Sequence, residues 1–191
     1  MNHSPYPVIL DACVLYPSLL RDLLIRLGIA GLYQPQWTAT IHNEWQRNLL
    51  KNRPDLTSKQ IEYIATLMDK AIPSAMINGY EELIDGLVLP DLNDRHVLAA
   101  AIRCNAETIV TFNLKDFPKE KLIKFNIEAL HPDEFISDLL DLNHALVLSV
   151  IYNQRKNMKK PAMNIQQYFE SLLRQSLPMT VKSLEKYTAI I

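Results

Sequence analysis

The chain alternates between short, continuous apolar runs and longer stretches with helical spacing. Residues 6–10 (YPVIL) form the first apolar run, and residues 107–111 (ETIVT) are rich in β-branched side chains. Runs without alternation are typical of strands that a parallel sheet buries on both faces. Between them, residues 18–27 repeat leucine at intervals of one, three and four, as an amphipathic helix does. Strands separated by helices predict an α/β fold with a parallel sheet.

The same patterns predict the other elements of this fold. Weaker strands are expected over 34–37 and 123–130, with a brief one over 74–78, which gives a sheet of four or five strands with helices on both faces. Helices are expected over 38–50, 57–72, 80–87, 132–140 and a stretch that begins within 90–94 and continues to 102. Thr38, and Thr57 or Ser58, are placed to cap two of these helices.

The pattern changes after Asn143, where three short helices are expected over 144–156, 164–175 and 178–189. We therefore predict a core domain over residues 1–142 and a helical extension over 143–191. The extension is basic: residues 151–191 hold 7 Lys and Arg against 2 Asp and Glu, whereas residues 1–150 hold 13 against 19. Such a tail is consistent with a polyanionic partner, and equally with an ordinary solvated helical face.

Composition bears on the cellular location of the protein. The chain has 191 residues, a net charge of -1 and two cysteines, Cys13 and Cys104, too few for a disulfide framework. A reducing cytoplasm is the expected location. No apolar run reaches the roughly 18 residues that a membrane helix needs, and residues 1–7 lack the features of a signal peptide.

Carboxylates fall where the predicted strands end and the predicted helices begin. Asp11 follows the first strand, Asp116 follows the strand over 107–111, and Asp91 and Asp94 stand at a helix start. In an open α/β sheet these positions share one edge, where ligands bind. Glu44 lies on the helix over 38–50.

Clustered carboxylates repel one another, and a hard divalent cation such as Mg²⁺ or Mn²⁺ offsets that charge best. Structural roles remain as alternatives: Asp91 could cap a helix, Asp116 could cap a short helix at Pro118, and Glu44 could be a surface residue. Capping explains Asp94 less well, because Asp91 would already serve as the cap. His96 is expected to pack or to face solvent.

Five segments in this order resemble the PIN-domain nucleases, specifically the toxin-like ribonucleases of the VapC type. They are VILDACVLYPSLLRDLL, IHNEWQRNLL, LPDLNDRHVLAAAI, IVTFNLKDFP and HPDEF, and they span about Val8 to Leu140. The resemblance implies a PIN-like parallel sheet flanked by helices and a metal-dependent endoribonuclease. It also implies the toxin of a toxin–antitoxin pair, with RNA as substrate, a cognate antitoxin protein as partner, and a homodimer.

By this resemblance, the catalytic acids are Asp11, Glu44, Asp94 and Asp116. Asp11, Asp94 and Asp116, together with Asp91, would hold Mg²⁺ or Mn²⁺, while Glu44 would bind the metal or orient the attacking water. Asn113 and Cys13 would line the site. Relatives often carry Asn or Ser at the Cys13 position to orient the first Asp, and a thiol is a weaker donor, so this departure bears on catalytic strength.

The extension lies outside these motifs. Its densest basic cluster is RKNMKK, which contains Arg155, Lys156, Lys159 and Lys160. Because the catalytic edge is acidic, we predict that these four residues bind RNA phosphates. The alternative is that they dock the antitoxin or a second subunit.

Two other functions remain as hypotheses. The chain could be a PIN fold that binds RNA or protein without cutting, although the four intact acids argue against it. A phosphoaspartyl phosphatase with Asp11 as nucleophile is weaker, because such enzymes need a second Asp two residues later, where Cys13 stands.

Overall fold

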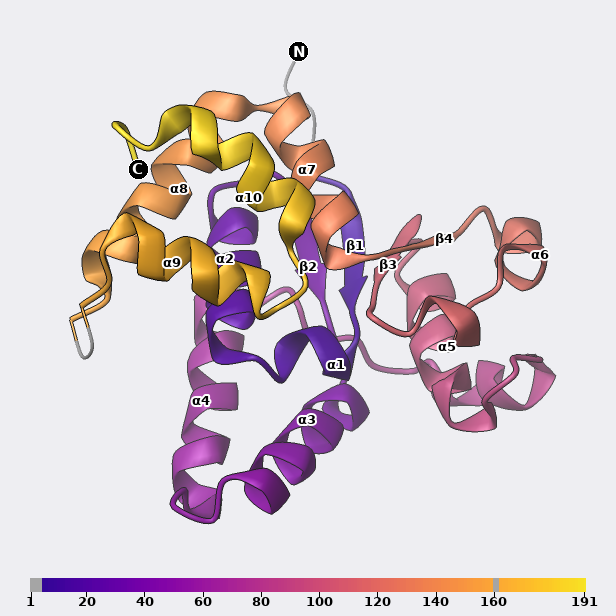
Figure 1. The fold of residues 1–191 in the computed structure, drawn as a ribbon. Helices are drawn as coiled ribbons and strands as arrows, with labels where there is room; N and C mark the ends of the chain where they lie inside the picture. The colour runs from indigo at the N-terminus through magenta and orange to yellow at the C-terminus, as the bar shows by residue number, and fades with distance from the viewer. Residues whose placement is uncertain (1–4, 160–161) are drawn as a thin grey trace.

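A computed structural model describes residues 5–159 and 162–191 (Figure 1). Its sheet has the strand order β2-β1-β3-β4, and every neighbouring pair is parallel. The strands are β1 (Pro7–Leu10), β2 (Gln34–Gln36), β3 (Thr108–Val110) and β4 (Glu128–Leu130). The predicted α/β class with a parallel sheet flanked by helices is therefore confirmed, with four strands in the described part of the chain.

Helices surround the sheet and make up the C-terminal part of the chain (Figure 1). The α-helices are α1 (Ala12–Leu15), α2 (Ser18–Ile29), α3 (Ala39–Asn52), α4 (Ser58–Ala71), α5 (Arg95–Arg103), α6 (Lys119–Leu122), α7 (Pro132–Leu142), α8 (His144–Asn157), α9 (Ile165–Leu173) and α10 (Pro178–Leu184). The 3₁₀-helices are η1 (Glu81–Gly86), η2 (Leu92–Asp94), η3 (Leu114–Asp116), η4 (Ile123–Phe125) and η5 (Glu185–Tyr187). Within the described residues, no helix combines the length and apolarity that crossing a membrane requires.

Local sequence chemistry accounts for the best-predicted boundaries. The Thr38 hydroxyl accepts a hydrogen bond from the Ile41 backbone N–H at 3.1 Å and so caps α3. Thr57 and Gln60 form a reciprocal capping box that starts α4. Both helices therefore begin where a side-chain oxygen satisfies backbone N–H groups that the helix leaves free.

Three weak predictions need correction. The strand expected over 74–78 is a single bridge between Trp37 and Met76, and the helix expected over 80–87 is the 3₁₀ turn η1. The strand expected over 123–130 begins only at Glu128, because η4 and a left-handed residue at Asn126 (φ 56°) precede it. In each case the apolar pattern was too short to fix the backbone geometry.

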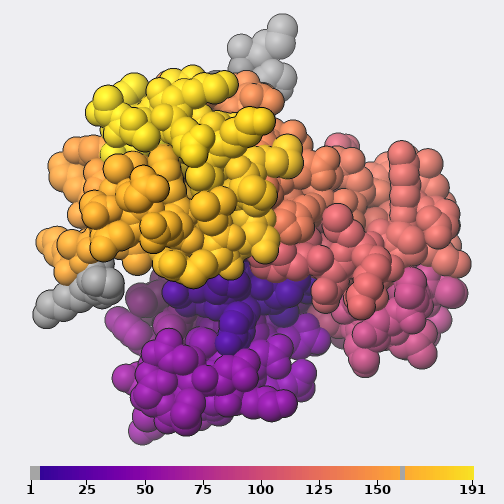
Figure 2. Space-filling model, in the orientation of Figure 1, coloured from indigo at the N-terminus to yellow at the C-terminus, as the bar shows by residue number. Residues whose placement is uncertain are grey.

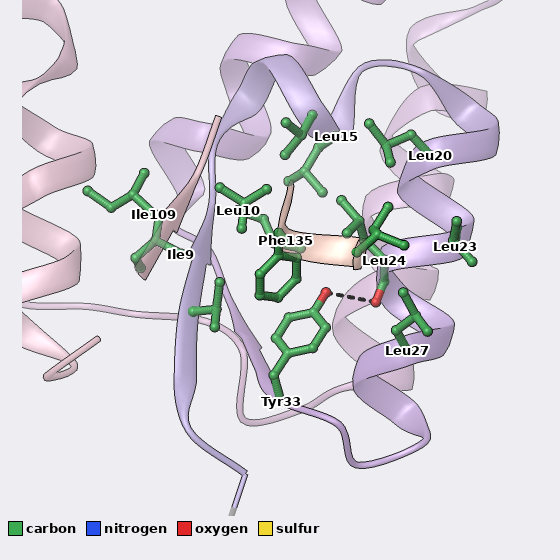
Figure 3. Close-up of a cluster of buried hydrophobic side chains, with 14 of the residues drawn as sticks. Ile9, Leu10, Leu15, Leu20, Leu23, Leu24, Leu27, Tyr33, Ile109 and Phe135 are labelled. Atoms are coloured by element: carbon green, nitrogen blue, oxygen red, sulfur yellow. Dashed lines mark hydrogen bonds between the residues drawn. The ribbon is translucent and has the colours of Figure 1, made fainter. Parts of the chain in front are cut away.

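The hydrophobic core lies between the sheet and α2 (Figure 3). Leu10 of β1 faces a row of leucines on α2, whereas Ile9 and its register partner Ile109 of β3 point to the opposite face of the sheet, and all are fully buried. Tyr33 packs edge-on against Phe135 of α7, with 4.9 Å between ring centroids, and its hydroxyl donates to the Leu24 carbonyl at 2.8 Å. The core thus fixes β1 and β3 side by side, and with them the residues that follow each strand.

The C-terminal helices pack on this core rather than standing apart from it (Figure 1). Gln154 of α8 donates from Nε2 to the Leu19 carbonyl at 3.0 Å and to Asp22 Oδ2 at 2.8 Å, both on α2. Its Oε1 accepts a hydrogen bond from the Tyr168 hydroxyl of α9 at 2.6 Å. One buried amide therefore connects α8, α9 and α2, with every polar group satisfied.

Candidate active site

Asp11 lies at the carboxyl end of β1, in the middle of the sheet, and is 5% exposed. Its Oδ1 accepts a hydrogen bond from the Ala12 backbone N–H at 2.6 Å, which starts α1. Its Oδ2 accepts from the Thr111 hydroxyl at 2.7 Å and from the Cys13 thiol at 3.1 Å. Burial raises the pKa of Asp11, while these hydrogen bonds act in the opposite direction by stabilising the charged form.

Thr111 was missed by the sequence reasoning, yet it is the closest side-chain partner of Asp11 across the sheet. It is fully buried and follows β3 directly, as Asp11 follows β1. Its hydroxyl also accepts the Asn113 backbone N–H at 3.0 Å, so it fixes the start of the loop that carries Asp116. A short polar side chain after a buried strand was the available signal, the same one that identified Asp11.

Cys13 occupies the position where the resemblance placed it, beside Asp11. Burial, followed by the charge of Asp11, raises the pKa of the Cys13 thiol to about 12, so it stays protonated and donates to the carboxylate. Its sulfur accepts the Phe112 backbone N–H at 3.2 Å. The thiol therefore links the loops that follow β1 and β3.

Asp94 is a second acid of the site with a raised pKa. It precedes α5, but its carboxylate forms no capping hydrogen bond. Its pKa is raised to about 6, first by burial and then by the charges of neighbouring carboxylates (Asp11, Asp91, Asp116 and Glu44). Acids from four separate segments thus act on one half-buried carboxylate, and repulsion of this kind is common at functional sites.

The structure supports a capping role for Asp91 but not for Asp116. Asp91 Oδ1 accepts the Asn93 backbone N–H at 2.8 Å and caps η2, as the capping alternative proposed. Asp116 ends η3 and does not cap the next helix, because the cap residue of α6 is Pro118, with no side-chain hydrogen bond. Asn113 is exposed at the start of η3.

Glu44 has a partner that the sequence did not reveal. Its Oε1 lies 3.1 Å from His96 Nε2, and the two side chains are 27% and 9% exposed. The expectation that His96 packs or faces solvent is therefore incomplete: it is buried and also holds Glu44. His96 Nδ1 is buried without a hydrogen-bond partner. The spacing of 52 residues explains why neither residue pointed to the other in the sequence.

The side chains are not in a closed metal cage. Over residues 5–159 and 162–191, no three His, Cys, Asp or Glu side chains converge closely enough to hold an ion. The donors that approach one another are carboxylate oxygens at the carboxyl edge of a parallel sheet, where open α/β folds bind their ligands.

The basic cluster of the extension lies elsewhere. Figure 1 places the end of α8 and the helix α5, which follows Asp94, on opposite flanks of the molecule. Arg155 donates from Nη1 to the Met163 carbonyl at 3.1 Å and from Nη2 to the Ile191 carbonyl at 2.9 Å. Lys156 and Lys159 are exposed, and Lys160 lies outside the described residues. Arg155 therefore already holds the C-terminal helices together.

Comparison with known proteins matches the part of the chain that carries these acids to a known family. The family model described as the PIN domain matches residues 7–115, which include Asp11, Glu44 and Asp94. This chain belongs to the PIN-domain family. A second family model, described as the VapC50 C-terminal domain, matches residues 132–186.

One curated relative shares the VapC50 name of the second family model. The chain is 45% identical over 87 residues to a protein of Mycobacterium tuberculosis (strain H37Rv) named "Putative ribonuclease VapC50". The aligned region covers 46% of this PIN-domain chain and 51% of that relative, about half of its length. No solved structure matches this chain.

Proposed function

We propose that this PIN-domain protein is a metal-dependent endoribonuclease, the toxin of a toxin–antitoxin pair. The observation that carries the proposal is the convergence of acids on Asp94, whose pKa reaches about 6 without any capping role. A fold tolerates such repulsion when function requires it. The relative named as a ribonuclease supports RNA as the substrate.

The residues fit a hard divalent cation. The available donors are carboxylate oxygens, which Mg²⁺ and Mn²⁺ prefer. Asp11, Asp94 and Asp116 would hold the ion, with Asp91 beside them. When bound, it would supply positive charge to the phosphate oxygens and lower the pKa of a water.

The chain's own residues prepare the site for hydrolysis. Thr111 and Cys13 hold Oδ2 of Asp11, so this carboxylate keeps one orientation. His96 holds Glu44, which would orient the attacking water. In the reaction, the water oxygen bonds to phosphorus, one P–O ester bond breaks, and a proton passes to the leaving oxygen.

An antitoxin protein, a homodimer and a cytoplasmic location complete the proposal. These assignments rest on the likeness to the VapC-type relative. The predicted RNA contacts of Lys156, Lys159 and Lys160 stay part of the proposal, whereas Arg155 is less available because two carbonyls occupy its guanidinium.

The proposal is tested with the parent chain, Asp94→Asn and the control Glu62→Gln, which changes an exposed acid on α4. End-labelled total RNA is incubated with Mn²⁺ or Mg²⁺, and then with EDTA. We expect the parent and the control to cleave the RNA when metal is present. EDTA, or the Asp94→Asn substitution, should abolish the cleavage. Equal cutting by Asp94→Asn, or cutting that persists in EDTA, would refute the assignment.

A melting series separates this function from the non-cleaving alternative. A metal that binds only the folded state raises the melting temperature by mass action. We expect Mn²⁺ to raise it in the parent and to have no effect in an Asp11→Ala/Asp94→Ala double variant. RNA binding without metal stabilisation and without cleavage would instead favour a binding module.

A further inference from the structure

The region on the far side of η3 from the acids contains two adjoining hollows. The larger, about 510 Å³, is lined by η3, the start of α6 and the edge of β4. The smaller, about 250 Å³, lies between the end of α5 and η4. They share Glu107, Asn126 and Ile127, so together they form one groove. We name it the β4 groove. Its larger hollow is within the usual size range of ligand pockets.

The turn η3 separates this groove from the acids. Leu114 and Phe117 are three residues apart, share one face of the turn and line the larger hollow. Asp116 lies between them in sequence and acts on Asp94 through its charge. The groove and the catalytic edge are therefore on two sides of a single helical turn, about 10 Å thick with its side chains.

Lysines are frequent in the segment from η3 to η4, which lines much of the groove. Lys115, Lys119, Lys121 and Lys124 all fall between the last residues of η3 and the end of η4, and Lys119 lines the larger hollow. Within the described residues, none of the four ammonium groups lies within 4.0 Å of a carboxylate. Free ammonium groups beside a hollow favour a polyanion over a neutral ligand.

The groove also offers surfaces for flat, apolar groups. Leu114 and Ile123, which line the larger hollow, are 39% and 60% exposed. Phe125 lines the smaller hollow, and the Lys124 ammonium lies 4.8 Å from its ring centroid. Grooves that combine basic residues with aromatic platforms are how proteins bind single-stranded nucleic acids.

We infer that the β4 groove binds the single-stranded RNA segment next to the cleaved bond, with bases in the two hollows and phosphates on the lysines. This inference rests on the proposed function for its choice of ligand. It deepens that proposal, because it places the substrate on one side of η3 and the scissile phosphate on the other. It also competes with the basic cluster of the extension, which lies on the opposite flank (Figures 1 and 2).

The carboxylates in the groove give it a base preference. Glu107 and Glu128 are exposed and line the larger hollow, so they repel phosphates and accept hydrogen bonds from base amino groups. Cytosine offers such a donor at N4, whereas uracil presents an acceptor there. The groove should therefore bind cytosine more tightly than uracil.

The first experiment measures RNA affinity in EDTA, where cleavage is blocked. The probe is a fluorescent single-stranded RNA of about 12 nucleotides, within the range that single-strand sites cover. A Lys115→Ala/Lys119→Ala/Lys124→Ala variant is compared with the parent and with Lys156→Ala/Lys159→Ala, which removes two exposed lysines from the extension. Affinity is measured across a salt series.

We expect the groove variant to bind at least tenfold more weakly and to lose about 2 from the slope of log affinity against log salt, because each single-strand phosphate contact contributes about 0.7. The extension variant should lose less affinity and less of the salt slope than the groove variant. The reverse ranking, or an unchanged groove variant, overturns the inference; an unchanged affinity would leave the groove to a peptide ligand.

The second experiment tests the hollows. Oligocytidine should bind about fivefold more tightly than oligouridine, and Glu128→Gln should remove the difference. Phe125→Leu should weaken both about fivefold through lost stacking, with its melting curve recorded to show that it folds. Equal affinity for both oligomers in the parent overturns the base assignment.

The two proposals can fail separately. If the parent cuts RNA and the groove variant binds and cuts as well as the parent, the groove inference is wrong and the nuclease assignment stands. If RNA binds through the groove but Mn²⁺ and Mg²⁺ give no cleavage, the nuclease assignment is wrong and the groove remains.

Discussion

Two aspartates at helix starts, Asp94 and Asp133, have opposite environments. Asp133 is 4% exposed, and its two carboxylate oxygens accept the backbone N–H groups of Met179 and Thr180, each at 2.8 Å. The Asp94 carboxylate caps no helix, and burial, followed by the charges of other carboxylates, raises its pKa to about 6. The protein provides hydrogen-bond donors to both oxygens of Asp133, whereas the Asp94 carboxylate is repelled by neighbouring carboxylates.

The hydrogen bonds of these two carboxylates distinguish a structural acid from a candidate site acid more clearly than their burial does. Asp133 sits in the first turn of α7, yet it caps α10, whose own cap residue, Leu177, makes no side-chain hydrogen bond. It holds a late helix to the core by charge-assisted hydrogen bonds. The repulsion at Asp94 has no such compensation within the chain, which is what a site for an external cation requires.

The largest effect should come from Asp133→Ala. Two buried N–H groups of α10 would lose their acceptor, and we expect the free energy of unfolding to fall by about 3 kcal/mol. Denaturant unfolding measures it. Glu134→Ala, an exposed acid in the same turn, should change stability by less than about 0.5 kcal/mol. If both variants behaved alike, the Asp133 contacts would not be structural.

Asp94→Asn should show the opposite behaviour. Cleavage should fall at least about 100-fold, because the proposed site loses a carboxylate that would hold the charge-stabilising ion. Metal-free stability should stay equal or rise by up to about 1 kcal/mol, because like-charge repulsion is removed. A loss of several kcal/mol in EDTA would instead class Asp94 with Asp133.

The smallest effect is a pH dependence of metal-free stability. The pKa of Asp94 is about 6 in the folded chain and about 3.8 when unfolded, so the folded state binds this proton more tightly. The stability from this group is present below about pH 4 and is lost as pH rises to about 6. Since Asp94 is only half buried, we expect about 1 kcal/mol.

Unfolding in EDTA at pH 4, 5, 6 and 7 measures this change, and the parent is compared with Asp94→Asn. The difference in unfolding free energy between the parent and Asp94→Asn should grow between about pH 4 and pH 6 and then level off. A constant difference would mean that the neighbouring carboxylates do not perturb Asp94.

The sequence predicted interactions between residues that are close together in the chain better than interactions between distant residues. The Thr38 cap and a cap at Thr57 or Ser58 were predicted from the sequence, as was the first strand, and both caps act over three residues. The contact of Asp133 with α10 spans 46 residues, and nothing close to Asp133 in the sequence points to it. Long-range pairing leaves no periodic signal, so only the folded chain reveals it.

The same reason explains what was found and missed at the site. Asp11 stood out because a carboxylate after a buried strand has no structural role of its own. Thr111, in the equivalent place after β3, did not stand out because a hydroxyl is an ordinary strand residue. His96 and Glu44 became a pair only when α3 and α5 were placed together.

The Gln154 junction also bears on how the protein associates with other molecules. α8 follows α7 after the single residue Asn143, and through Gln154 it lies against α2 as a bound partner would. Because this partner belongs to the same polypeptide, its effective concentration is fixed by the connection and does not fall on dilution. This side of α2 is therefore occupied at any protein concentration, and an incoming subunit has to use other surfaces.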